Sequence, residues 1–310
     1  MRKTLLTAMT AIGAGVAVAL GTGLSTAQPK AAPWQQVGSD VKSGISGLAV
    51  TYRSGGNLHA LVVRDNKRPG ENRVAEVTYR HGQAAVATPL TWLGGAEPVD
   101  LEALDAVPGT SDEYVAVASR GLAYHLELTD AGEAVRVLDI APLPAIGTGD
   151  DFESFTLTSR HGKTVAVWAD RGEGKDRPAT LYAAPFSINS YGESKFGAVK
   201  TATFRAPYPK GDVRHASDME VTRSGRLLVS SASDAGDDGP FDSAVSDAGR
   251  VSVTSAGRVR LSVDKTPELL TKFKGHKIEA LHCVPGSRVA ALGTDDENAG
   301  GAVTMHRLCD

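Results

Sequence analysis

We predict an all-β fold, a five-bladed β-propeller with four-stranded antiparallel blades, from three observations on this 310-residue chain. A short segment recurs five times, at intervals of 56, 51, 67 and 59 residues. Each copy is followed by turn residues and a second apolar run, which is typical of a strand–turn–strand unit. Helical signals are few. Repeats of this length correspond to one propeller blade each.

The recurring segment has an apolar residue, then a polar residue, then a run of small and apolar residues. The polar positions are Ser46, Glu102, Glu153, Glu220 and Glu279. Second strands are expected at 58–63, 114–118, 164–169, 226–230 and 288–292, third strands at 73–79, 122–128, 179–184, 250–254 and 302–308, and fourth strands at 84–92, 134–140, 196–204 and 258–263. The last unit lacks a fourth strand, and we expect residues 34–41 to supply it. Closing the ring in this way removes both free sheet edges.

Other assignments remain open. The 67-residue interval leaves room for extra strands, so a six-bladed propeller is the alternative, and a pair of β-sandwiches is the third choice. Residues 266–270 resemble a capped first helical turn, which predicts a short helix there. Residues 101–107 can also be read as helical, but their equivalence to four strand-like segments favours a strand.

The N-terminus predicts export. Arg2 and Lys3 precede an uncharged, largely apolar stretch, and residues 25–27 are small where a signal peptidase cleaves. We expect a signal peptide over 1–27, a single propeller domain over 28–310 and a secreted, extracellular product. A membrane anchor is the alternative, but the stretch is short and diluted by glycine. After cleavage we expect a monomer with no membrane association.

Charge and composition exclude some classes of partner. Lys and Arg number 33 against 36 Asp and Glu, a formal charge of −3 with no basic block, so we expect no nucleic-acid partner. Aromatic residues make up only 5% of the chain, which is low for a site that stacks on carbohydrate. Cys283 and Cys309 predict one disulfide in an oxidising compartment, with two unpaired thiols as the alternative.

The five recurring polar positions predict a metal site. In a propeller the first strand of each blade lines the central channel, and side chains alternate across a strand. If the preceding apolar residues pack between blades, the polar ones converge on the channel, where carboxylates alone would repel one another. Ca²⁺ takes roughly six to eight oxygen ligands in irregular geometry. The expected Ca²⁺ ligands are Ser46, Glu102, Glu153, Glu220 and Glu279. The alternative is that these residues only cap exposed strand starts.

Polar residues at the ends of the second strands should lie at the same mouth of the channel, because those strands return antiparallel to the first. Acids and arginines around a metal suit a phosphorylated or carboxylated ligand. The candidate catalytic residues are Asp65, Arg120, Asp170, Arg171, His215 and Asp295. The aspartates are candidate bases, the arginines candidate anion clamps, and His215 a further candidate base. Ordinary polar loop chemistry is the alternative for each.

These residues resemble two groups of propellers. Residues 151–153, 277–281 and 295–298 resemble the secreted bacterial family of esterase-like phytases. The order Ser, Glu, Glu followed by further ring positions on five blades is similar to the calcium-activated nucleotidases (apyrases). In that family one Ca²⁺ in the channel is held by Ser and Glu, and the substrates are nucleoside di- and triphosphates. Glu220 stands where a Ser is expected in them, and residues 64–66 match only part of their acidic pair with Arg.

The resemblance implies a secreted, Ca²⁺-dependent phosphohydrolase or esterase with a small anionic or ester substrate. A non-catalytic propeller that binds a ligand or a partner protein, with a structural Ca²⁺, is the second hypothesis. Fold alone does not choose between them, because propellers host many functions.

Overall fold

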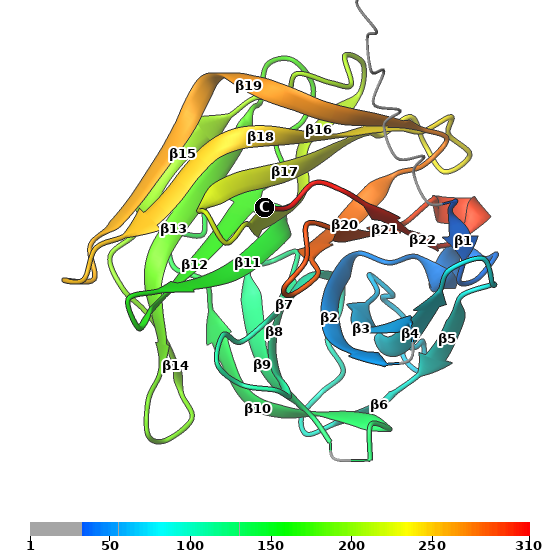
Figure 1. Cartoon of the computed structure of the whole chain (residues 1–310), viewed down its shortest axis with the longest axis horizontal. Coiled ribbons are helices and arrows are strands. Elements are labelled where there is room, and N and C mark those ends of the chain that lie inside the picture. Colours follow the sequence, from blue (N-terminus) through cyan, green and yellow to red (C-terminus); the bar gives the residue numbers. More distant parts are fainter. Residues whose placement is uncertain (1–32, 55, 130) are drawn as a thin grey trace, which may run out of the picture. The chain divides into compact units, whose positions relative to one another are not determined.

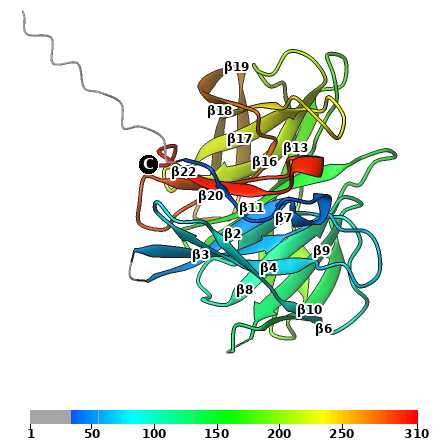
Figure 2. The same cartoon turned by 90° about the vertical axis from the view of Figure 1, so that its right-hand side faces the viewer.

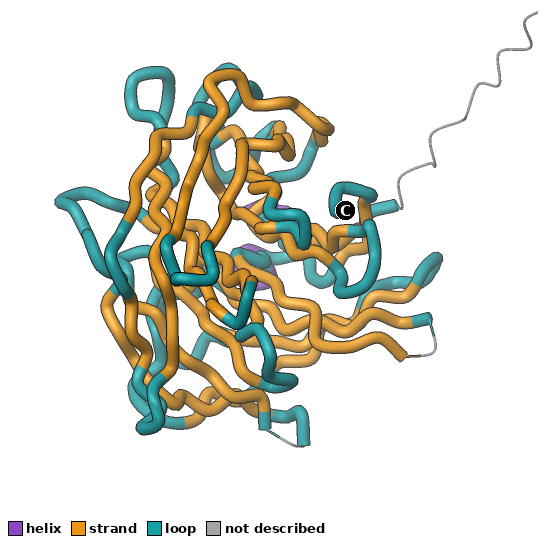
Figure 3. The backbone as a smooth tube through the Cα atoms, turned by 60° about the vertical axis from the view of Figure 1, so that its left-hand side comes forward, coloured by secondary structure: helices purple, strands orange, loops and turns teal. Residues whose placement is uncertain are grey.

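The computed structural model describes residues 33–54, 56–129 and 131–310, which consist almost entirely of strands and loops (Figure 3). They form five largely antiparallel sheets and two short 3-10 segments, η1 (Val41–Ser43) and η2 (Glu297–Ala299). The prediction of an all-β, five-bladed propeller is confirmed. The expected signal peptide over 1–27 lies outside the described residues and stays a prediction. None of the described residues belongs to a helix long and apolar enough to span a membrane.

Each sheet is one blade (Figure 1). Blade 1 contains β2 (Gly47–Ser54), β3 (Asn57–Val63), β4 (Val74–Arg80) and β5 (Val86–Pro89). Blade 2 contains β7 (Leu101–Ala106), β8 (Glu113–Ala118), β9 (Leu122–Leu128) and β10 (Ala134–Pro142), with β6 (Thr91–Leu93) added parallel to β10. Blade 3 contains β11 (Phe152–Arg160), β12 (Lys163–Asp170) and β13 (Ala179–Ile188), and both β14 (Ser194–Phe196) and β15 (Lys200–Phe204) pair with β13. Blade 4 contains β16 (Val213–Val221), β17 (Arg226–Ser233), β18 (Asp242–Val253) and β19 (Val259–Lys274). Blade 5 contains β20 (Ile278–Cys283), β21 (Ala290–Thr294), β22 (Ala302–His306) and β1 (Gln35–Gln36).

The first strands of the five blades are the innermost ones. β2, β7, β11, β16 and β20 contact one another in cyclic order. The apolar residue that precedes a recurring polar position is fully buried in blades 1, 2, 3 and 5, as Ile45, Leu101, Phe152 and Ile278. These side chains belong to the apolar clusters that join neighbouring blades. Burying them fixes which side chains face the channel.

The N-terminal strand closes the last blade, as the sequence predicts. β1 pairs antiparallel with β22, Gln35 opposite Val303, so the two strands lie side by side in Figures 1 and 2. β1 ends at Gln36, which is shorter than the expected 34–41. The predicted disulfide between Cys283 and Cys309 is also present and ties the end of the chain to β20.

Two expectations are corrected. Residues 266–270 belong to β19 and not to a helix, and Pro267 falls where the pairing with β18 is interrupted, so its missing N–H costs no ladder hydrogen bond. The long interval that suggested a sixth blade contains β14 and β15, which are extra strands of blade 3.

Candidate metal and acid–base site in the channel

One ring of side chains occupies equivalent positions near the start of the innermost strands. In blades 2, 3 and 5 a register shift follows the first paired residue, and the residues at the shift are Glu102, Glu153 and Glu279. Such a bulge re-aims the side chain and changes the alternation of the strand after it. In blade 1, Ser46 takes this position directly before β2.

Arg214, not Glu220, completes this ring. The first pair of β16 is Val213 with Ser233, and Arg214 follows it as the glutamates follow theirs. The prediction of Glu220 at this level is wrong, because the register shift between Arg214 and Asp218 inserts residues that the repeat pattern did not reveal. A signal was present, since residues 212–214 read acid, apolar, charged like 100–102 and 151–153. We call Ser46, Glu102, Glu153, Arg214 and Glu279 the mouth ring.

Ion pairs within the chain neutralise one side of the mouth ring. Arg214 Nη1 lies 3.3 Å from Glu153 Oε1 and 3.1 Å from Glu279 Oε1. Arg171 donates to the same Glu153 oxygen at 2.8 Å, and Lys277 Nζ lies 3.0 Å from Glu279 Oε1. Burial disfavours charge on Arg214, but the two glutamates outweigh it and raise the pKa of its guanidinium. Arginine and lysine side chains therefore neutralise part of the carboxylate charge that Ca²⁺ alone was expected to neutralise.

The other side of the mouth ring is acidic. Carboxylate oxygens of Asp65, Asp100 and Glu102 lie within 4.8 Å of one another. The nearby cation is Lys67, whose Nζ lies 2.9 Å from Asp100 but whose side chain is 60% exposed. Burial opposes ionisation of Asp100, yet hydrogen bonds from Ser119, Glu102 and Lys67 lower its pKa. Asp100 is therefore the carboxyl of this group that most readily ionises.

Three residues of the mouth ring have side-chain oxygens that the protein does not fully satisfy with hydrogen bonds or positive charge. Burial, followed by the charges of Glu153 and Glu279, raises the pKa of Glu102 well above its ordinary value. Among the described residues, neither the fully buried Ser46 Oγ nor Glu153 Oε2 has a hydrogen-bond partner. Blades 1, 2 and 3 thus present a hydroxyl and two carboxylates at one level of the channel.

Asp65 and Asp295 lie close to this ring and have shifted pKa values. Burial and the charge of Glu279 raise the pKa of Asp65 to about 6. Burial, with the charges of Glu279 and Asp65, raises the pKa of Asp295 to about 8. Asp295 is 3% exposed and accepts a hydrogen bond from the Glu297 N–H at 3.0 Å. At neutral pH one carboxyl is mostly ionised and the other mostly protonated, a pairing that suits acid–base chemistry.

Asp170 and Arg171 follow each other but face different partners. Arg171 reaches Glu153 of the mouth ring. Asp170 accepts hydrogen bonds from the N–H groups of Asp151 at 3.0 Å and Gly172 at 3.3 Å, and it also pairs with Arg177. Its carboxylate therefore orders the loop that carries Arg171.

Arg120 and His215 stand apart from the mouth ring. Arg120 is exposed in the turn after β8. His215 is 2% exposed, and its Nδ1 accepts from the Ala206 N–H at 3.1 Å while its Nε2 donates to the Gly174 carbonyl at 2.7 Å. Both ring nitrogens make hydrogen bonds to the backbone, so neither is free to accept a proton from a substrate as a general base.

A second polar level, which the repeat pattern did not predict, lies deeper along the same strands. Asp105, Thr156, Asp218 and His282 occupy equivalent registers on four blades, and we call them the deep ring. His282 Nε2 lies 3.2 Å from Asp105 Oδ1, and Thr156 Oγ1 donates to Asp105 Oδ2 at 2.9 Å. The available signal was a polar residue three positions after both Glu102 and Glu279.

No family model matches this chain, and no curated protein matches it. Several solved structures are similar in architecture. A putative exo-β-1,3-galactanase from Bifidobacterium bifidum is 11% identical, with a TM-score of 0.47 over 89% of this chain and 94% of that one. An α-L-arabinofuranosidase from Fusarium graminearum is 8% identical, with a TM-score of 0.46 over 90% of this chain and 98% of that one. A GH43 β-1,3-galactosidase is 9% identical, with a TM-score of 0.45 over 89% of this chain and 94% of that one.

At these identities and TM-scores, the solved structures do not indicate the activity of this protein. The pairing of strands within the five sheets establishes the fold. The resemblance to esterase-like phytases and calcium-activated nucleotidases is supported in its propeller architecture alone, and its metal and substrates remain hypotheses.

Proposed function

We propose that the protein is a Ca²⁺-dependent hydrolase that cleaves phosphate or ester bonds at the mouth of the channel. The observation that carries the proposal is the acidic side of the mouth ring. Carboxylates of Asp65, Asp100 and Glu102 meet within 4.8 Å there. The oxygens Ser46 Oγ and Glu153 Oε2, which lack partners among the described residues, belong to the same ring. Every candidate ligand is an oxygen, which Ca²⁺ prefers.

The surrounding residues suit hydrolysis of an anionic substrate. A Ca²⁺ held there would polarise a phosphoryl or carbonyl oxygen and orient the attacking water. Arg214 belongs to the mouth ring and Arg171 lies beside it, and both favour a ligand with negative charge. Asp295, whose pKa burial raises to about 8, holds a proton at neutral pH. In the proposed step a water gives one proton to the ionised Asp65 while its oxygen bonds to phosphorus or carbon, the bond to the leaving oxygen breaks, and that oxygen takes the Asp295 proton.

A non-catalytic propeller with a structural ion is the second candidate function. One observation favours it: Arg171 and Arg214 are already paired with Glu153, and Arg214 also with Glu279. A substrate anion would have to compete with these internal pairs for the two guanidinium groups.

The test is a turnover screen on nucleotides, phytate and p-nitrophenyl esters, each with Ca²⁺ and with a chelator. The variant is Glu102→Gln. The matched control is Glu127→Gln, which removes a carboxylate of the same blade that pairs with the exposed Arg136. We expect Ca²⁺-dependent turnover in the wild type and the control, and its loss in Glu102→Gln. Ca²⁺ binding without turnover would move the assignment to the non-catalytic candidate. Turnover that a chelator leaves intact would overturn the proposal.

A further inference from the structure

A chemically different group of ligands lies deeper in the channel. Ligand atoms of Asp105, Glu220 and His282, from β7, β16 and β20, lie within 4.8 Å of one another, and all three residues are buried. Asp105 is three residues beyond Glu102, and His282 three beyond Glu279, which is about 10 Å along a strand. This group is therefore separate from the acidic side of the mouth ring.

The imidazole of His282 is held in the manner of a metal ligand. Its Nε2 lies 3.2 Å from Asp105 Oδ1, while its Nδ1 is buried and has no hydrogen-bond partner among the described residues. Asp105 is itself fixed by Thr156 Oγ1 at 2.9 Å and by the Leu157 N–H at 2.6 Å. Histidines that bind metals characteristically have one nitrogen oriented by a carboxylate.

Among the described residues, no ion pair compensates the two acidic side chains of blade 4 near His282. Glu220 is 8% exposed and Asp218 is 2% exposed, and no ion pair of either is found within the described residues. Asp218 Oδ2 accepts from the Leu281 N–H at 2.7 Å, but its Oδ1 is buried without a partner in the same part of the chain. A buried carboxylate of this kind is costly unless it binds a proton or a metal.

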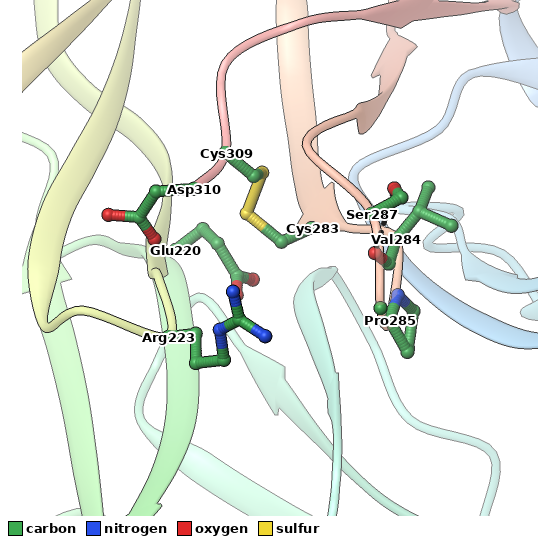
Figure 4. A pocket seen from close by; sticks show the side chains of 9 residues that line it. Glu220, Arg223, Cys283, Val284, Pro285, Ser287, Cys309 and Asp310 are labelled. Atoms are coloured by element: carbon green, nitrogen blue, oxygen red, sulfur yellow. Dashed lines mark hydrogen bonds between the residues drawn. A yellow bond between two sulfur atoms is a disulfide. The ribbon is translucent and has the colours of Figure 1, made fainter.

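A pocket reaches one member of this group, Glu220. A cavity of about 260 Å³ is lined by Glu220, Arg223, Asp310 and the Cys283–Cys309 disulfide. Figure 4 shows Glu220 beside that disulfide, with Arg223 extending from the turn after β16. A metal site needs such an entry path.

We infer that His282 and Glu220, next to the orienting carboxylate of Asp105, bind a transition-metal dication at the deep end of the channel. A mixed nitrogen and oxygen donor set suits Zn²⁺ or a similar ion, whereas Ca²⁺ and Mg²⁺ prefer oxygen alone. The inference does not depend on the proposed hydrolase activity.

The test uses Zn²⁺ alone as the probe, on full-length protein stripped with a chelator and dialysed. Calorimetric titration should give one tight site per chain. Zn²⁺ at 100 times its dissociation constant should raise the Tm by about 5 °C or more. Both effects should be lost in His282→Gln and in Glu220→Gln.

Two control variants distinguish Zn²⁺ bound by this group from Zn²⁺ bound elsewhere on the chain. His125→Gln also removes a buried histidine whose Nε2 faces a carboxylate, Glu113 at 2.8 Å, but lies outside this ligand group, so Zn²⁺ binding should persist. Glu102→Gln should keep Zn²⁺ binding even where it loses Ca²⁺. Absence of a tight Zn²⁺ site in the wild type overturns the inference. So does unchanged binding in Glu220→Gln, which serves as the decisive variant if His282→Gln does not fold.

Discussion

Replacing Arg214 with Gln tests whether the ion pairs hold the mouth ring together. Its guanidinium lies 3.3 Å from Glu153, 3.1 Å from Glu279 and 2.8 Å from Asp234. The side chains of the two glutamates are 4% and 5% exposed, whereas that of Asp234 is 36% exposed. Removing one partner of a buried ion pair costs about 3–5 kcal/mol, and an exposed pair contributes below about 1 kcal/mol. Because each glutamate keeps a second cationic partner, we expect the free energy of unfolding to fall by about 3 kcal/mol.

Urea unfolding followed by tryptophan fluorescence measures this loss, since Trp168 is fully buried. The matched control is Arg136→Gln, whose guanidinium lies 2.6 Å from Glu127 with side chains 54% and 32% exposed. That substitution should cost below about 1 kcal/mol. Arg214→Lys should recover only part of the loss, because an ammonium group cannot reach three carboxylates in the planar geometry of a guanidinium. If Arg214→Gln costs no more than Arg136→Gln, the network does not stabilise the ring and the reasoning fails.

Two raised pKa values and the disulfide can each be tested directly. Because the folded state raises the pKa of Asp295 to about 8, it keeps a proton that the unfolded chain releases near pH 4, so stability falls as pH rises between these values. Asp295→Asn should remove the contribution of Asp295 to this slope and gain up to about 4 kcal/mol at pH 7, measured as urea midpoints against pH; an unchanged slope contradicts it. Ca²⁺ affinity should fall as pH drops through about 6, because Asp65 must lose its proton to bind the ion. Calorimetry from pH 5 to 8 checks this, and a constant affinity argues against Asp65 as a ligand. The Cys283–Cys309 bridge spans 26 residues, so the double Ser variant should lose about 3.5 kcal/mol of unfolding free energy; a loss near zero in a chemical denaturation series speaks against the chain-entropy account.

The blade architecture was predictable from the sequence because each blade repeats the same local pattern. Apolar residues such as Ile45 and Phe152 must be buried between blades, and every repeat therefore has an apolar residue at that position. The closing strand was predictable for a different reason, since the last repeat lacks a fourth strand and a propeller leaves no edge open. The predicted helix near Pro267 failed because tertiary pairing with β18 outweighs a local capping signal.

The composition of the ring was only partly predictable. Three glutamates and Ser46 fall at the expected level because their blades share one register. In blade 4 the register shift after Arg214 moves Glu220 deeper, and a repeat aligned on Glu cannot detect residues inserted in a bulge. The deep ring was missed for a related reason: its members differ chemically from blade to blade, so no repeated residue type marks them.

The mixed composition of the mouth ring places positive charge on one side of the channel and negative charge on the other. Four glutamates and a serine would present nearly uniform negative charge, of which one central dication would neutralise about half. With Arg214 in blade 4 and Arg171 beside it, positive charge gathers on one side, while Asp65, Asp100 and Glu102 gather on the other. An anion that ligates a cation on the acidic side would extend one end toward the arginines, and charge complementarity would fix its orientation. Arg214→Glu removes this polarity and should strengthen Ca²⁺ binding while weakening the binding of any phosphate ligand. Parallel changes in the two affinities, measured by calorimetry, would show that the anion binds through the ion and not through Arg214.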